Sequence, residues 1–187
     1  MGSHRFKAGG QFAKGPSSLN DGLVSHWRLG EVGGYRWDSV GGMHMRPSSL
    51  TATNVNAVAG KMHRAATFPG SAAGYLYVPD FSFAAYGNDD WAISFWFHST
   101  DLGVFVPLCG HYASSGSQRA WYLGVDWAAS NKLLVDLSHD GGTPMTRVLS
   151  TGVTTSAAWN FAYFAHDGAN DLLLLSVNGE AANTAAH

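Results

Sequence analysis

Asp126 and Asp136 are the two carboxylates that the sequence would bring closest together. They lie in two apolar runs, "AWYLGVDW" and "KLLVDL", and a hairpin of these runs would carry both aspartates on its outward face. Glycoside hydrolysis needs such a pair, about 5–5.5 Å apart in retaining enzymes. Because outward carboxylates on strands are usually just solvated, we predict no hydrolytic site at this pair.

No other constellation of catalytic residues stands out. The chain has no G-x-S-x-G, HExxH, P-loop or G-x-G-x-x-G pattern, and its nine histidines lack the spacing of a zinc site. The single cysteine, Cys109, lies in the apolar run "VFVPLCG" and is predicted to be a buried, unreactive thiol. The sequence therefore predicts a protein that is not an enzyme.

Calcium is the one cofactor for which the sequence offers ligands. Ca²⁺ takes six to eight oxygen ligands, usually including carboxylates. The candidates are Asn88, Asp89 and Asp90 in "YGNDD" and Asp140 in "HDGGT". Asn and Asp are also common turn residues, so turn formation is the alternative for all four. We expect no resident cofactor, with calcium at these residues as the alternative.

Aromatic residues beside polar ones are candidates for a sugar-binding surface. Such sites combine an exposed aromatic ring with a few hydrogen-bonding groups. The candidates at expected loops and strand ends are Trp37, His111, Tyr112, Asp126 and Trp127. The alternative for each aromatic ring is that it packs as a cap on the core.

Short apolar runs separated by turn residues would position these side chains. Charged residues make up only 13% of the chain and aromatic residues another 13%, with 23 glycines, which favours an all-β protein with many turns. In "AISFWFHS", aromatic bulk on both faces predicts a central strand that is covered on both sides. The runs predict a sandwich or a barrel, and the expected strands are "LVSHWRL", "YLYVPDFSF", "WAISFWFHS", "VFVPLCG", "AWYLGVDW", "KLLVDLS", "TRVLST", "WNFAYFAHD" and "LLLLSVNG".

Two hairpins can be predicted in detail. In the first, three inward residues of one strand face three of the next: Trp121, Leu123 and Val125 against Leu133, Val135 and Leu137. The second begins at Asn178-Gly179, the strongest short signal for a two-residue turn with positive φ at both positions. Almost no chain follows to form its returning strand. We expect a longer polypeptide, or alternatively a neighbouring subunit, to complete that sheet.

The order of these motifs resembles the laminin-G-like branch of the concanavalin A-like jelly rolls. The resemblance covers about residues 22 to 180, and it implies an all-β, two-sheet antiparallel jelly-roll sandwich that lacks its last strands. It also implies a lectin or interaction module. The segments that carry the resemblance are "GLVSHWRLGE", "WDSVGG", "GKMHRAATFPG", "YLYVPD", "WAISFWFHS", "WNFAYFAHDG" and "LLLLSVNG".

The chain departs from this family at two functional positions. The laminarinase-like hydrolases carry Glu-x-Asp-x-x-Glu on one strand, whereas the two glutamates here, Glu31 and Glu180, lie in unrelated places. Many calcium-binding relatives have acidic residues after the Phe-x-Gly turn, where this chain has Ser71, Ala72 and Ala73. The resemblance therefore implies binding without hydrolysis, and these departures argue against the family's calcium site.

Residues 1–20 form a basic arm ahead of the expected jelly roll of residues 21–187. The arm is rich in Gly and Ser and holds three of the chain's 11 basic residues but none of its 13 acidic ones. Such a segment cannot bury enough surface to fold by itself, so it is either a disordered leader or an arm that orders on a partner. The candidate docking residues are Arg5, Phe6, Lys7, Phe12 and Lys14.

Charge and hydropathy narrow the class of partner. A net charge of −2 without a Lys/Arg cluster argues against nucleic acid, and no apolar run approaches the ~18 residues that span a bilayer. The N-terminus also lacks the apolar region of a secretory leader. We expect the partners to be other protein subunits, in a homo-oligomer or with capsid or tail proteins, together with glycans.

Two functions remain open at this stage. The first is a structural module on the surface of a phage virion, such as a capsid decoration or fibre protein, which docks through the arm and could also bind glycans. The second is a carbohydrate-binding lectin module of a bacterial secreted or cell-surface protein. The arm separates them, because docking requires Phe6 and Phe12, whereas a free lectin loses nothing when residues 1–20 are removed.

Overall fold

The chain is all β in the part that the computed structural model describes. Every strand pairing there is antiparallel, so the predicted all-β class is confirmed. That part contains no helix of the length and apolarity needed to cross a membrane. The chain divides into two compact units, Met1–Pro79 and Asp80–His187. The described residues are 21–48, 55–70, 74–79, 90–112, 119–138, 140–143 and 145–186.

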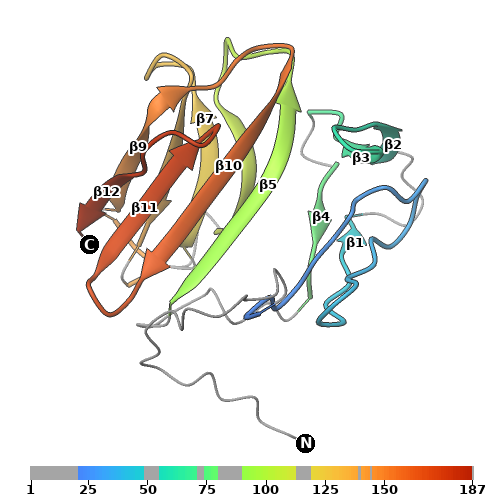
Figure 1. The fold of residues 1–187 in the computed structure, drawn as a ribbon, viewed down its shortest axis with the longest axis horizontal. Helices are drawn as coiled ribbons and strands as arrows, with labels where there is room; N and C mark the ends of the chain where they lie inside the picture. The colour runs from blue at the N-terminus through green and yellow to red at the C-terminus, as the bar shows by residue number, and fades with distance from the viewer. Residues whose placement is uncertain are drawn as a thin grey trace, which may run out of the picture. The chain divides into compact units, whose positions relative to one another are not determined.

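The first unit contains two small sheets (Figure 1). In one, β1 pairs with β4, and in the other the hairpin strands β2 and β3 pair with each other. The β2–β3 hairpin was not predicted, because its alanine-rich strands have few large apolar residues. The strands are β1 (Arg46–Pro47), β2 (Asn56–Ala59), β3 (Arg64–Thr67) and β4 (Leu76–Tyr77).

The predicted opening strand "LVSHWRL" does not form. Trp27 makes only an isolated bridge with Asp38. The adjacent amide of His26 donates to the Asp38 carboxylate at 2.9 Å instead of to a strand partner. The side chain of Asp38 thus takes a backbone donor that a regular sheet would have used, and the segment follows a loop.

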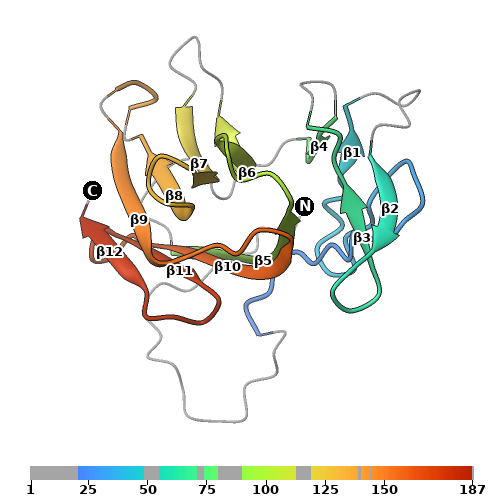
Figure 2. The same ribbon diagram turned by 90° about the horizontal axis from the view of Figure 1, so that it is seen from above.

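The second unit contains two four-stranded sheets, whose strand orders are β12-β11-β10-β5 and β6-β7-β8-β9. The first of these sheets faces the viewer in Figure 1, and Figure 2 shows the two sheets as separate layers. The strands are β5 (Trp91–Ser99), β6 (Val106–Tyr112), β7 (Arg119–Asp126), β8 (Lys132–Leu137), β9 (Thr146–Val153), β10 (Ala158–Asp167), β11 (Leu172–Val177) and β12 (Asn183–Ala186).

Inward side chains of both sheets meet in one hydrophobic core. The predicted hairpin of β7 and β8 and its inward residues are confirmed, and the register places Trp121 opposite Leu137 and Leu123 opposite Val135. Phe164 of β10 packs against Trp121 from the other sheet, with ring centroids 5.7 Å apart. A core shared between two sheets is compatible with a β-sandwich.

β5 does not occupy the central position that its aromatic residues suggested. Among the described residues β5 pairs only with β10, so it is an edge strand. Its inward residues Ile93, Phe95 and Phe97 contact the core as expected, but Trp96 on the other face is 41% exposed. The prediction was wrong because bulky residues on both faces of a strand do not reveal how many neighbours it has.

The turn predicted at Asn178-Gly179 is present, with φ of 54° and 78° at the two residues. A short returning strand, β12, follows it and pairs with β11, so the expectation of almost no return is corrected. Pairing resumes only at Leu175 and Asn183, which makes the loop longer than two residues. Ser176 donates its hydroxyl to the Glu180 carbonyl at 2.6 Å and closes this wider loop.

Candidate binding surface

A row of polar side chains crosses three strands of the β6-β7-β8-β9 sheet on the face opposite the core. Tyr122 of β7 lies opposite Asp136 of β8, which lies opposite Arg147 of β9. The Tyr122 hydroxyl donates to Asp136 Oδ2 at 2.5 Å. Arg147 donates from Nε and Nη2 to the two oxygens of the same carboxylate at 2.8 and 2.7 Å. We call these three residues the polar row.

Aromatic rings flank the polar row. The rings of Phe105 and Tyr112 meet the Tyr122 ring edge-on, with centroids 5.8 and 5.1 Å away. Gly124 makes room for Phe105, because a Cβ at that position would overlap its ring. Phe105 is 40% exposed and Tyr112 is 43% exposed. Phe105, Tyr112 and Tyr122 form what we call the aromatic strip, a half-exposed aromatic surface beside a fixed polar group.

The polar row is electrically balanced. The Asp136 carboxylate is buried and Arg147 neutralises it, while the guanidinium side chain of Arg147 is 54% exposed. Burial, followed by the hydrogen bond to Asp136, raises the pKa of Tyr122 to about 12. The hydrogen bond to Asp136 is also the main cause of the raised pKa of Arg147. At neutral pH the row therefore presents one phenol and one ion pair with little net charge.

The pH dependence of stability tests this arrangement. A Tyr122 pKa raised above the unfolded value of ~10 stabilises the fold below pH ~10, and that contribution is lost as the pH rises towards about 12. We expect the urea midpoint of the wild type to fall more steeply over this interval than that of Tyr122→Phe. If the urea midpoint of both proteins fell equally with pH, the hydrogen bond from Tyr122 to Asp136 would be contradicted, since the two proteins share all other titrating groups.

Asp126 and Asp136 both lie on the outward face of β7 and β8, as predicted, but they are not neighbours there. Asp136 lies opposite Tyr122, whereas Asp126 lies opposite Lys132 at the far end of β7. Asp136 is also buried, which corrects the expectation that both carboxylates are solvated. Tyr122 and Arg147 cover it, and their contact depends on the pairing of three strands.

Of the other predicted site residues in this unit, only Tyr112 belongs to the aromatic strip. His111 lies opposite the core residue Trp121, and therefore on the other face of the sheet. Asp126 accepts a hydrogen bond from the Ala128 amide at 2.9 Å, and the adjacent Trp127 is 56% exposed in the same turn. Tyr112 pairs at the start of β7 and Asp126 ends that strand, so these candidates do not converge.

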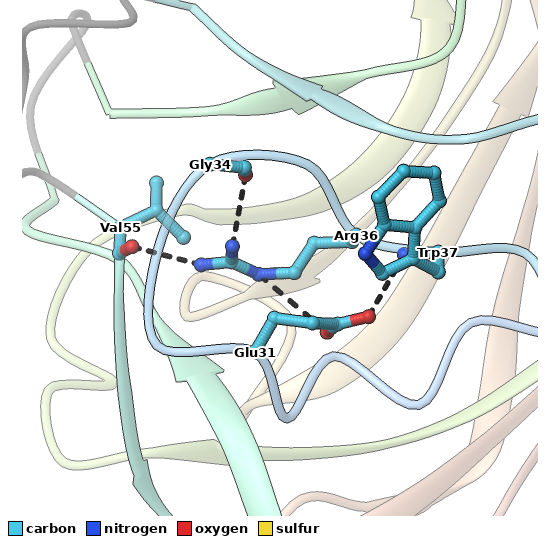
Figure 3. Close-up of polar contacts among 5 residues, drawn as sticks. All are labelled: Glu31, Gly34, Arg36, Trp37 and Val55. Atoms are coloured by element: carbon cyan, nitrogen blue, oxygen red, sulfur yellow. Dashed lines mark hydrogen bonds and ion pairs between the residues drawn. The ribbon is translucent and has the colours of Figure 1, made fainter.

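Trp37 lies in the first unit, in a loop that a buried arginine holds in place (Figure 3). Arg36 is fully buried and donates to the carbonyls of Gly34 and Val55, each at 2.9 Å. Its Nε lies 4.0 Å from the Glu31 carboxylate, whose other oxygen accepts the Trp37 amide at 2.8 Å. Trp37 is 58% exposed.

Asp38, beside Trp37, cannot serve a ligand there. Its carboxylate accepts backbone amides from His26, Val40 and Met43, each at 2.9 Å. Burial by itself would raise the pKa of Asp38, but these hydrogen bonds outweigh burial and hold it well below its usual range. The Asp38 carboxylate is used to hold the loop together, so it does not serve as a ligand-binding group beside Trp37.

The calcium candidates that are described each accept a backbone amide, Asp140 within its own loop and Asp90 from a distant one. Asp90 accepts the Gly168 amide at 2.9 Å, and Asp140 accepts the Gly142 amide at 2.8 Å. Within the described ranges, no three His, Cys, Asp or Glu side chains gather as a metal site. Asn88 and Asp89 lie outside the described residues, as do the arm candidates Arg5, Phe6, Lys7, Phe12 and Lys14.

Cys109 of β6 packs against the core. Burial raises the pKa of its thiol to about 12, so the thiol stays protonated at neutral pH. This agrees with the predicted unreactive cysteine.

Sequence reasoning missed three of the five residues at this surface, Phe105, Tyr122 and Arg147, and it gave Asp136 no role in binding. One signal was available, since Tyr122 alternates with core residues of β7 and must face away from them. Nothing local indicates that Arg147 lies beside Asp136, because the two meet through strand pairing.

Comparisons with known proteins identified no relative of this chain. No protein-family model matches the chain, and a search of curated proteins found no match.

Proposed function

We propose that this protein is a non-enzymatic binding module that holds a glycan on the aromatic strip. The observation that carries the proposal is the strip itself, where exposed rings of Phe105 and Tyr112 flank a tyrosine fixed by an ion pair. The apolar C–H face of a sugar ring stacks on an aromatic ring, while adjacent polar groups bind its hydroxyls. Phe105 and Tyr112 supply the first kind of contact.

Arg147 supplies the second kind of contact. Its Nε and Nη2 are used by Asp136, so among the described contacts Nη1 is the nitrogen left for a ligand hydroxyl. The bidentate pair also restricts the guanidinium to one orientation, which lowers the entropy cost of binding. Since the polar row has little net charge, we propose a neutral sugar as the ligand.

The resemblance to laminin-G-like domains supports a jelly-roll sandwich as the scaffold of this site. Together with the basic arm, it supports the setting that we propose, a module displayed on a larger assembly such as a phage virion decoration or fibre protein. The second candidate is a lectin module of a bacterial secreted or cell-surface protein. The aromatic strip favours glycan binding equally in both settings.

Truncation of Tyr112 tests the proposed site. We expect Tyr112→Ala to weaken binding to a glycan identified on an array by roughly 3- to 10-fold, since contact with one aromatic ring contributes about 0.5–1.5 kcal/mol. Isothermal titration with that glycan gives the affinities. The matched control is Tyr77→Ala, which removes an equally exposed tyrosine from the first unit and should leave affinity unchanged. Equal losses in the two variants, or an array without any ligand, would refute the site.

A further inference from the structure

The two sheets of the second unit have four edges, and three carry features that block pairing with another strand. β12 has only four residues. β6 contains Pro107 and two register shifts against β7. At β9, the Leu149 carbonyl already accepts the Asn183 side chain at 2.9 Å. Short strands, proline, bulges and covering contacts are the usual protections of sheet edges.

Within the described part of the chain, the fourth edge, β5, has no proline, bulge or short length of this kind. It runs for nine residues and pairs with β10 at nine consecutive positions without a register shift. No Asp, Glu, Lys, Arg or Pro occurs between Trp91 and Ser99. A long, regular and uncharged edge is a template for the addition of another strand.

We propose that β5 of a second copy of this chain pairs antiparallel with β5, around a two-fold axis at Phe95. Phe95 is the middle residue of the strand, so a centred pairing uses its whole length. On the core face, Ile93 then lies opposite Phe97 of the other copy. On the outward face, Ser94 lies opposite Trp96, which sets a small side chain beside a large one.

The charge and exposure of β5 favour a second copy as the occupant. In an isologous pair, the same residues of the two chains lie close together around the two-fold axis. A strand without Asp, Glu, Lys or Arg can pair in this way without like-charge repulsion. Trp96 is 41% exposed, and its ring centroid lies 5.3 Å from that of Phe161 on β10. A partner strand would therefore add to the aromatic surface that these two residues form. The dimer would join two four-stranded sheets into one of eight.

This dimer goes beyond the proposed glycan binding and does not depend on it. The aromatic strip lies on the β6-β7-β8-β9 sheet, whereas the dimer uses the other sheet. A dimer would carry two aromatic strips, and two linked sites bind a multivalent surface more tightly than one.

The mass of the full chain in solution tests the dimer. Sedimentation equilibrium should give twice the 19.9 kDa chain mass for the wild type. Ser94 is exposed, and Ser94→Lys places two like charges diagonally across the two-fold axis, so its dimer Kd should rise by at least ~10-fold. The matched control is Thr184→Lys, on the exposed edge strand β12 of the same sheet, which should remain dimeric. Near-UV circular dichroism shows whether both variants stay folded.

A cross-linking experiment tests the register. Ser94→Cys and Trp96→Cys chains, mixed under mild oxidation, should form a disulfide-linked dimer faster than either variant alone, because residue 94 lies directly opposite residue 96, whereas two copies of residue 94, or of residue 96, lie diagonally. A monomeric wild type would overturn the proposal. A Ser94→Lys protein that dimerises as tightly as the wild type would overturn it too.

Discussion

Arg36→Ala is expected to lower the free energy of unfolding of the first unit by about 3–5 kcal/mol, because it removes a buried charge that three groups depend on. The carbonyls of Gly34 and Val55 lose their donor, and the Glu31 carboxylate loses its counter-charge. Val55 is buried, so its carbonyl would pay the full cost of desolvation once it has no partner. The truncation also leaves a cavity where the guanidinium lay.

Peptide-resolved hydrogen exchange measures this effect in each unit separately. Amides of β2 and β3 should lose ~100-fold or more of their protection in Arg36→Ala, since each factor of ten corresponds to about 1.4 kcal/mol. Arg46→Ala is the matched control, because Arg46 is exposed and its removal, which includes its cation–π contact with Tyr35, should cost no more than about 1 kcal/mol. Similar losses of protection in the two variants would show that Arg36 does not hold this loop.

Phe164→Ala is expected to destabilise the second unit by about 3–5 kcal/mol, the usual cost of emptying a phenylalanine site in a packed core. Phe164 is fully buried between the sheets. Its ring meets that of Trp91 edge-on, with centroids 4.9 Å apart, and it also contacts Trp121 of the opposite sheet. Because these neighbours are large and mutually packed, they cannot collapse far into the space left behind.

The same strand provides the control for Phe164. Phe161 lies on the outward face of β10 and is half-buried against Trp96, so Phe161→Ala should cost only about 1–2 kcal/mol. Urea unfolding of the two variants gives the difference, read as a shift of the midpoint at unchanged slope. Equal midpoints would mean that the face of β10 towards the other sheet is not the core.

Much of the second unit could be predicted from the sequence. Alternation in "AWYLGVDW" and "KLLVDL" identified the inward residues of β7 and β8, since side chains alternate between faces with a period of two. The Asn178-Gly179 turn followed in the same way from the backbone conformation that its two residues favour. Tyr112 was recognised as a surface aromatic because it lies beside polar residues at a strand end.

The candidate site was predicted only in part. Asp136 was expected to be solvated, yet Tyr122 and Arg147 bury it from two neighbouring strands. The fold of the first unit was not predicted for a similar reason. Hydrogen bonds of Asp38 and Arg36, rather than alternating apolar residues, determine the path of the chain there. Polar side chains that replace sheet pairing leave no periodic signal.

The sequence by itself determined the all-β class, the faces of most strands in the second unit and the residues of the β7–β8 hairpin, because these depend on local alternation and turn chemistry. Only the tertiary structure decided that β5 lies at an edge and that Arg147 neutralises Asp136. The physical reason is that strand neighbours are chosen by long-range packing of whole faces. A residue's own segment specifies which way it points, but not what it meets.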